Sequence, residues 1–365
     1  MHGEEAQQHI PLAPNLAALT DAEHPWDVFA QLRSVREMKT NQGQPYLVLE
    51  LVDLSAMFEG KIWSDSIKAM QAAKAAVPNQ TVKLRGMVKS YKGKPQLIIE
   101  NLRPVLPGDE GFDLGQIVDP ALSAVEDLVC RTLVIDIETV PAHDRTAMPE
   151  SVAEALTQFA QRKEPGAGKD IIEARIGMAM GLSPLFGKVV SLAIGDGDAE
   201  PGQEDITVLA VPPEGVLIDP VPPWLRLMSE PELLAAFWAL ASKAEVVVTF
   251  NGRNFDIPFL ATRSMIHGIP ARCDLLSQRF SLKPHLDLIE LLNQRDKGPG
   301  KLDVICWALG IESPKGEMDG SMVAPAYARG EILKIAEYNA HDVRATTAVF
   351  RKVRDSVLRY RKDWS

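Results

Sequence analysis

The stretch Arg131-Thr-Leu-Val-Ile-Asp-Ile-Glu-Thr-Val140 decides the fold, because an apolar run in it ends in two carboxylates. The run from Leu133 to Ile135 is typical of a strand buried on both faces. Asp136 and Glu138 are two residues apart, so both side chains project from the same face of an extended backbone. Such like charges repel each other unless a divalent cation neutralises them. A strand that runs out into a polar turn gives the same pattern, and only matching residues elsewhere separate the two interpretations.

Length and composition indicate a globular protein of two or three domains, because the chain has 365 residues and is 46% hydrophobic. Residues 1–9 are polar and acidic, unlike a secretion signal. No apolar run reaches the ~18 residues that a membrane span needs. The three cysteines, Cys130, Cys273 and Cys306, form no Cys-x-x-Cys pair. We therefore expect a cytoplasmic protein with reduced thiols and no zinc site.

The charge is unevenly distributed along the chain. Between Trp26 and Leu106 there are 12 lysines and arginines against 7 aspartates and glutamates, a balance of +5. The formal net charge of the whole chain is −10, so the remainder carries −15. This asymmetry predicts a basic binding module joined to an acidic body.

The basic segment, residues 26–106, reads as five strands with one helix between the third and the fourth. We expect the strands at 29–38, 46–53, 58–63, 81–91 and 95–102 and the helix at 66–76. This order is typical of an all-β OB-fold barrel, whose sheet face commonly binds oligonucleotides. Residues 1–25 are interpreted as a tail and 107–129 as a linker to the domain at 130–365.

On this strand register, six side chains that face away from the barrel core combine cations with aromatic rings. They are Lys61, Trp63, Lys83, Arg85, Lys89 and Tyr91. Proteins that bind single-stranded nucleic acid use this combination for phosphates and bases, but an ordinary solvated face with two stray aromatics fits the spacing equally. The segment also resembles the OB domains that precede catalytic domains in bacterial nucleases and tRNA synthetases, at residues 43–46, 60–63 and 82–86. That resemblance favours nucleic-acid binding.

The acidic body alternates strands and helices, which predicts an α/β domain with a mixed sheet flanked by helices. Further strands are expected at 188–195, 206–211 and 245–250, and a helix at 231–244. Residues 149–181 read as an insertion of two helices around a Pro-Gly-Ala-Gly break.

Two more acidic motifs follow in the body. Asp256 opens a helix after the polar turn that begins at Asn251, where it fits the N-cap position. Tyr338 and Asp342 are four residues apart on the last helix and share one face. Alone, each has an ordinary interpretation as a helix cap or a surface residue. Together with the first motif, in this chain order, they favour a common site.

These motifs resemble those of the DEDDy-type 3′-5′ exonucleases of the ribonuclease-H-like superfamily, similar to the proofreading domain of family B DNA polymerases and its stand-alone bacterial relatives. The carrying residues are Asp136, Glu138, Asp256, Tyr338 and Asp342, with further matches at 183–190, 285–288, 301–303 and 319–323. The resemblance spans about residues 131–353. The sister class has a histidine five residues before the last aspartate, where this chain has Glu337, so the tyrosine type is favoured.

The resemblance implies catalysis with two Mg²⁺ or Mn²⁺ ions. Asp136 would bridge both ions, Glu138 and Asp342 would complete the site that holds the attacking water, and Asp256 would hold the second ion. Tyr338 would orient the water, because a phenol with a pKa of ~10 is a poor base. Asn251 and Phe255 are expected to shape the pocket and contact the terminal nucleotide.

The leading expectation is an exonuclease that releases 5′ mononucleotides from single-stranded DNA, with the OB barrel binding the strand. RNA is a close alternative, because none of these motifs recognises or excludes a 2′-hydroxyl. A non-catalytic binding protein with a vestigial nuclease fold is a third alternative. Retention of all four carboxylates and the tyrosine argues against it.

Overall fold

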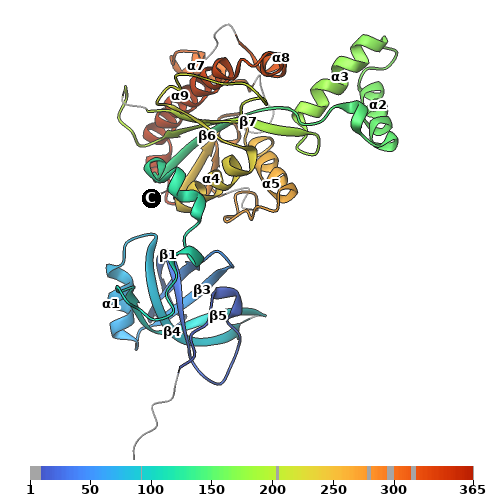
Figure 1. The fold of residues 1–365 in the computed structure, drawn as a ribbon. Helices are drawn as coiled ribbons and strands as arrows, with labels where there is room; N and C mark the ends of the chain where they lie inside the picture. Colours follow the sequence, from blue (N-terminus) through green and yellow to red (C-terminus); the bar gives the residue numbers. More distant parts are fainter. Residues whose placement is uncertain are drawn as a thin grey trace, which may run out of the picture. The chain divides into compact units, whose positions relative to one another are not determined.

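The chain divides into two compact units, Met1–Ser123 and Ala124–Ser365. The computed structural model (Figure 1) describes residues 10–91, 93–202, 205–277, 281–293, 300–313 and 318–364. Within these ranges, no helix has both the length and the hydropathy needed to cross a lipid bilayer.

The first unit is an OB-fold barrel, as predicted. Its elements are β1 (Trp26–Lys39), β2 (Pro45–Val52), β3 (Met57–Trp63), α1 (Ile67–Ala75), β4 (Gln80–Tyr91) and β5 (Lys94–Pro104). The strands close in the order β1-β2-β3-β5-β4. Alternate residues such as Leu47, Leu49 and Leu51 fill the interior. At Gly86 the register of β4 against β5 shifts, and a Cβ there would meet the Ile98 carbonyl oxygen at 2.2 Å, so only glycine fits.

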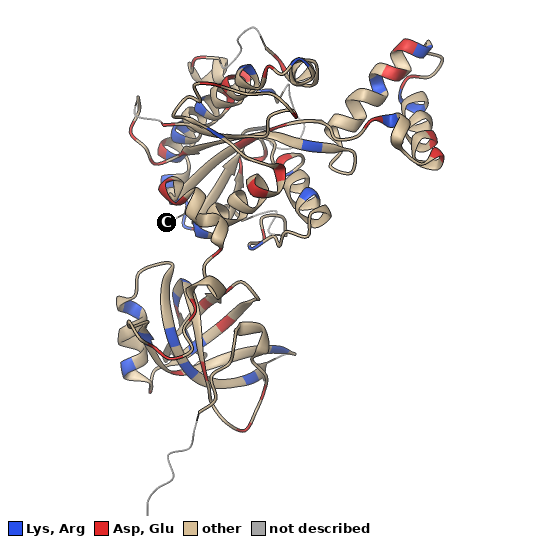
Figure 2. Cartoon of the chain, viewed as in Figure 1, with Lys and Arg blue, Asp and Glu red and all other residues tan. Residues whose placement is uncertain are grey.

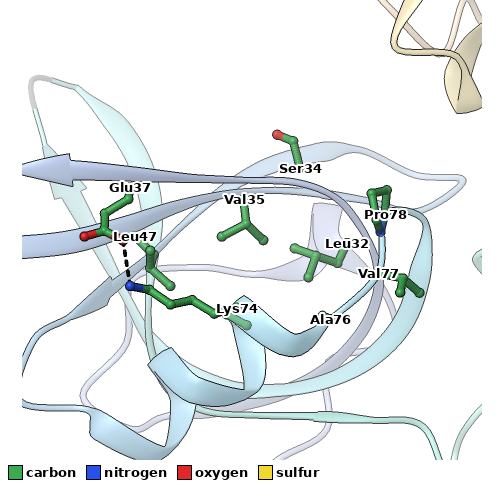
Figure 3. A pocket seen from close by; sticks show the side chains of 10 residues that line it. Leu32, Ser34, Val35, Glu37, Leu47, Lys74, Ala76, Val77 and Pro78 are labelled. Carbon is green, nitrogen blue, oxygen red and sulfur yellow. Dashed lines mark hydrogen bonds and ion pairs between the residues drawn. The ribbon is translucent and has the colours of Figure 1, made fainter. Parts of the chain in front are cut away.

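A cavity of about 360 Å³ opens in the barrel unit beside α1 (Figure 3). It is lined by Leu32, Ser34, Val35, Glu37, Leu47, Ala73, Lys74, Ala76, Val77 and Pro78. Lys74 and Glu37 form an ion pair of 2.6 Å at its wall. None of the residues predicted to bind nucleic acid lines this cavity, so it is separate from the predicted binding face.

The second unit contains a six-stranded mixed sheet in the order β11-β10-β6-β7-β8-β9. The strands are β6 (Thr132–Pro141), β7 (Gly187–Asp196), β8 (Thr207–Ala210), β9 (Leu225–Leu227), β10 (Val246–Thr249) and β11 (His285–Asp287). β6 lies parallel to β10 and antiparallel to β7, so the predicted mixed sheet is confirmed. Strands β9 and β11 were not predicted, because three residues are too few to show an alternating pattern.

Helices cover both faces of this sheet (Figure 1). α4 (Glu230–Lys243) and α5 (Asp256–Ile266) pack on one face, and α8 (Val323–Ala328) and α9 (Ile332–Ser356) pack on the other. Two short helices, α6 (Leu288–Asn293) and α7 (Leu302–Leu309), complete the unit. In β6, Val134 contacts the α9 side while Leu133 and Ile135 contact the α4 side. Burial on both faces explains why the run is continuously apolar.

The predicted helical insertion is confirmed as a hairpin between β6 and β7. α2 (Glu150–Lys163) and α3 (Lys169–Leu182) project away from the sheet in Figure 1 and share a small core around Leu156, Ile172 and Ile176.

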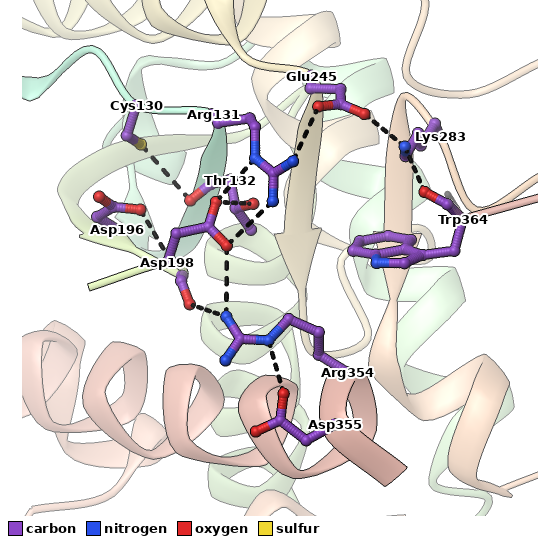
Figure 4. Close-up of polar contacts among 11 residues, drawn as sticks. Cys130, Arg131, Thr132, Asp196, Asp198, Glu245, Lys283, Arg354, Asp355 and Trp364 are labelled. Atoms are coloured by element: carbon purple, nitrogen blue, oxygen red, sulfur yellow. Dashed lines mark hydrogen bonds and ion pairs between the residues drawn. The ribbon is translucent and has the colours of Figure 1, made fainter. Parts of the chain in front are cut away.

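A network of charged groups lies at the end of the sheet where β6 begins (Figure 4). Asp198 accepts hydrogen bonds from Thr132 Oγ1 at 2.7 Å, Arg131 Nε at 3.2 Å and Arg354 Nη1 at 3.3 Å. Burial acts to raise the pKa of Asp198, but these hydrogen bonds and guanidinium charges outweigh it and lower the pKa. The network therefore stabilises the ionised carboxylate and ties α9 to the start of β6.

Replacing Asp198 with asparagine is expected to lower the melting temperature by about 3–6 °C, because a charged hydrogen-bond centre worth ~1–2 kcal/mol is weakened. Asp355, which pairs with Arg354 from an exposed position, provides the matched control Asp355→Asn. Thermal unfolding followed by circular dichroism would measure both variants. Equal melting temperatures for the two would contradict a structural role for Asp198.

Candidate active site

Three carboxylates from distant parts of the second unit meet at one point. Asp136 and Glu138 project from β6 on the face that α9 covers, and Asp342 comes from α9 itself. One oxygen of each lies within 4.8 Å of the others. Tyr338 precedes Asp342 by one helical turn, and its hydroxyl hydrogen-bonds with that carboxylate. The structure thus brings together four of the five residues expected to form the site.

Asp256 lies beside this cluster but outside the 4.8 Å group. It is the first residue of α5, as predicted, and the N-cap position belongs to Phe255, so the ordinary alternative interpretation of Asp256 as a helix cap does not apply. Its Oδ1 instead accepts the backbone N–H of Ile137 at 3.1 Å, which holds the carboxylate against β6. The charge of Asp256 contributes to raising the pKa of both Asp136 and Glu138, as expected for a close neighbour.

Burial and mutual repulsion shift the titration of every group in the cluster. Burial, with the neighbouring carboxylates, raises the pKa of Asp136 and of Glu138 well above the usual range. Burial raises the pKa of Asp256 to about 7 and that of Asp342 to about 6. It also raises the pKa of Tyr338 above its ordinary value, with Glu138 and Asp342 adding to the effect. The phenol therefore keeps its proton near neutral pH and acts as a hydrogen-bond donor.

The donor set fits a hard divalent cation. All candidate ligand atoms are carboxylate oxygens, which Mg²⁺ and Mn²⁺ prefer over the softer nitrogen and sulfur ligands. Carboxyl groups that hold protons in the metal-free protein would release those protons to the solvent when such a cation binds. The acidic cluster can therefore hold divalent metal.

Two buried residues that the sequence did not reveal fix the orientation of Asp136. Asn339 Nδ2 donates to Asp136 Oδ2 at 2.6 Å, and Ser191 Oγ donates to Asn339 Oδ1 at 2.7 Å. Both side chains are fully buried. Because the serine hydroxyl occupies the amide oxygen, the amide nitrogen must face Asp136. Only the pairing of β7 with β6, which sets Ser191 opposite Glu138, could have indicated this contact.

Replacing Ser191 with alanine is expected to raise the Mn²⁺ dissociation constant about tenfold. The alanine no longer holds the Asn339 amide, which in turn orients Asp136. Ser264→Ala is the matched control. That serine is also buried and accepts from Trp238 Nε1 at 2.8 Å, but it lies in α5 away from the cluster. Isothermal titration with Mn²⁺ would measure both. Equal dissociation constants would show that Ser191 does not position the ligand.

A further carboxylate, that of Asp287, holds the turn before α5. Asp287 accepts the backbone N–H groups of Asn251 at 2.8 Å and Arg253 at 3.0 Å. Asn251 adopts the left-handed conformation, with φ +66°, and its side chain is exposed. Phe255 is half-buried against Phe259 at a ring distance of 5.5 Å. Asn251 is thus open to a ligand, whereas much of the Phe255 ring packs into the core.

On the barrel, part of the predicted binding face forms an aromatic and cationic cluster. Lys61 Nζ lies 5.3 Å from the centroid of the Tyr91 ring and 6.0 Å from that of Tyr46. The rings of Tyr46 and Trp63 are 5.0 Å apart. Tyr46 was not predicted, although its pairing opposite Trp63 places it on the same face. This group, the Lys61 cluster, offers flat rings beside an ammonium group.

The predicted cations of the barrel all have acidic partners, including Lys61, whose Nζ lies 3.5 Å from Glu59 Oε1. Arg85 makes two hydrogen bonds to Asp27, of 2.6 and 2.9 Å, and Lys83 lies 3.8 Å from the same carboxylate. Lys89 lies 3.9 Å from Asp21. Lysine and arginine positions are spread over the barrel strands and α1 (Figure 2), but those of β4 are partly neutralised by acidic partners within the unit. Among the predicted cations of the barrel, Lys61 differs in the aromatic rings that lie beside its ammonium group.

Comparison with known proteins finds similarity to one curated protein and to solved structures. Over 83 residues the chain is 34% identical to the 3′-5′ exoribonuclease YhaM of Geobacillus sp. (strain WCH70), a match that covers 23% of this chain and 25% of that protein. The chain thus spans only about a quarter of this relative's length. The family B DNA polymerase of Pyrobaculum calidifontis aligns with 89% of this chain and 46% of its own, at 16% identity and a TM-score of 0.40. The second OB-fold domain of replication protein A from Methanococcus maripaludis aligns with 27% of this chain and 99% of its own, at 15% identity and a TM-score of 0.21.

A family model matches residues 225–359, a segment that includes Asp256, Tyr338 and Asp342 but not the two acidic residues of β6. By this match, the C-terminal unit carries a domain of the family of predicted 3′-5′ exonucleases related to the exonuclease domain of PolB.

Proposed function

We propose that the protein is a metal-dependent 3′-5′ exonuclease that removes 5′ mononucleotides from single-stranded DNA. The observation that carries this proposal is the meeting of Asp136, Glu138 and Asp342 within 4.8 Å, beside Asp256 and Tyr338. The family match over residues 225–359 supports the same reaction class.

The proposed site supplies what phosphodiester hydrolysis requires. The four carboxylates would hold two Mg²⁺ or Mn²⁺ ions, with Asp136 between them. When bound, such ions lower the pKa of a water molecule and neutralise charge on the phosphate. Tyr338, which keeps its proton, would donate a hydrogen bond that orients the attacking water. Asn339 and Ser191 would keep Asp136 in place while the substrate binds.

RNA is the second candidate substrate. The relative that matches over 83 residues is named an exoribonuclease, and the two functions share one chemistry. The choice between them depends on contacts to the 2′ position of the sugar, which the acidic cluster does not provide.

The barrel is proposed to bind the strand through the Lys61 cluster. Replacing Trp63 with alanine is expected to weaken oligonucleotide binding about tenfold, because stacking on an aromatic ring contributes ~1–3 kcal/mol per base. Tyr360→Ala removes an exposed aromatic from the C-terminal unit and serves as the control. Fluorescence anisotropy with a labelled single-stranded oligonucleotide would measure both. Unchanged affinity in Trp63→Ala would reject the proposal that the barrel binds the strand through the Lys61 cluster.

The decisive experiment incubates the purified protein with end-labelled single-stranded DNA, RNA and duplex DNA, each with Mg²⁺, Mn²⁺ or EDTA. We expect stepwise shortening of single-stranded DNA from its 3′ end with metal and none with EDTA. Cleavage of RNA alone would favour the second candidate. Absence of cleavage on every substrate would reject the enzymatic proposal and favour a binding protein.

A further inference from the structure

A lysine and a tyrosine outside the acidic cluster form a second feature of the same face of the sheet. Lys188 is the second residue of β7, and Tyr327 lies in α8. The Lys188 ammonium is 4.8 Å from the centroid of the Tyr327 ring. A cation at this distance over an aromatic face is attracted by the ring quadrupole, so the ring fixes where the lysine points.

Strand pairing puts Lys188 on the carboxylate face. Lys188 pairs opposite Val140, and paired residues of neighbouring strands share a face. Val140 and Val134 both pack under α8 and α9, and Asp136 and Glu138 occupy the alternate positions between them. From Glu138 to Val140 the strand advances about 7 Å. Measured along β6, Lys188 therefore lies roughly the length of one nucleotide from the acidic cluster.

Within the described residues, the Tyr327 ring is the partner of the Lys188 ammonium group. Its side chain is half-buried, and no carboxylate among the described residues pairs with it. The neighbouring Tyr327 is buried, and its hydroxyl has no hydrogen-bond partner within the described part of the chain. A partly desolvated ammonium group with no counter-charge is costly, and an anionic ligand would offset that cost.

We propose that Lys188, held by Tyr327, binds the phosphodiester next to the one that is cleaved, that is, the second linkage from the 3′ end of the substrate. This inference rests on the proposed exonuclease function. Lys188 would hold the strand in place, while the acidic cluster acts on the first linkage. The contact is with a phosphate charge, so it applies equally to DNA and RNA.

The test combines a protein change with a substrate change. The full-length protein and its Lys188→Met variant are assayed on single-stranded DNA whose second linkage from the 3′ end is either a normal phosphodiester or an uncharged methylphosphonate. We expect kcat/KM to fall about tenfold when either the ammonium or the phosphate charge is removed, which is typical for one charged hydrogen bond. Removing both should cost no more than removing one, because the same contact is lost.

Lys163→Met is the matched control, because Lys163 also lies over an aromatic ring, that of Phe159 at 5.9 Å, but in the helical hairpin. This variant should keep wild-type activity on the normal substrate and lose about tenfold on the methylphosphonate. Two results would overturn the inference and leave the exonuclease proposal intact. One is a Lys188→Met variant that loses a further factor of about ten on the methylphosphonate substrate, and the other is a Lys188→Met variant with wild-type activity on the normal substrate. Failure of the wild-type protein to cleave the normal DNA would instead reject the proposed action on DNA, and failure on the corresponding RNA as well would reject the exonuclease proposal itself.

Discussion

Replacing Asp136 with asparagine is expected to lower kcat/KM for strand hydrolysis by more than about 10³-fold and, at the same time, to raise the melting temperature of the metal-free protein. The loss follows because the proposed bridging ligand contributes several kcal/mol of charge stabilisation through the ions it holds. The gain follows because Asp136 is buried among like charges that raise its pKa well above the usual range. The asparagine keeps the shape of the side chain and is neutral without having to bind a proton.

Two measurements separate this explanation from simple unfolding. Activity is measured with labelled single-stranded DNA and Mn²⁺, and stability by thermal unfolding in EDTA. Asp355→Asn, an exposed carboxylate on the same helix as Asp342, should change neither activity nor stability appreciably. An Asp136→Asn protein that is inactive and also less stable would contradict the charge-repulsion argument, since the activity loss would then reflect a damaged fold. Residual activity within tenfold of wild type would contradict the role of Asp136 as a ligand.

Local sequence patterns were enough to predict most of the fold and the shared face of the residues within each motif of the site. Asp136 and Glu138 share a face because a strand alternates, and Tyr338 and Asp342 share a face because a helix repeats every 3.6 residues. Both rules act within a few residues, so the sequence alone reveals them. The same holds for the barrel, where alternation in β3 correctly placed Lys61 and Trp63 outside the core.

The sequence did not reveal contacts between segments far apart in the chain. Asp256 accepts a hydrogen bond from the backbone of Ile137, 119 residues earlier. Arg85 lies outside the core as predicted, but the pairing of β4 with β1 sets it opposite Asp27, to which it is hydrogen-bonded. The Ser191 contact depends on the pairing that sets Ser191 opposite Glu138. Such contacts require the strand register, which short-range periodicity does not supply.

The stability of the metal-free protein is expected to fall by about 5 °C in melting temperature between pH 5 and pH 8 because of the acidic cluster. Burial raises the pKa of Asp256 to about 7 and that of Asp342 to about 6, whereas an unfolded aspartate titrates near ~3.9. Between these values the folded chain binds more protons than the unfolded chain. Stability is therefore fully present below about pH 4 and is lost as the pH rises through about 7.

Divalent metal should reverse this dependence. Mn²⁺ competes with protons for the same oxygens, so at 100 times its dissociation constant it adds ~2.7 kcal/mol at pH 8 and much less at pH 5. Other groups titrate in the opposite sense: the pKa of Asp198 is lowered, so its contribution is lost as the pH falls. The comparison is therefore made between the wild type and Asp136→Asn, which share Asp198 and differ in the cluster. Melting curves at pH 5 and 8, with EDTA or Mn²⁺, should show a strong metal effect at pH 8 in the wild type alone. If both proteins respond equally to Mn²⁺, the ion binds elsewhere and the acidic cluster is not the metal site.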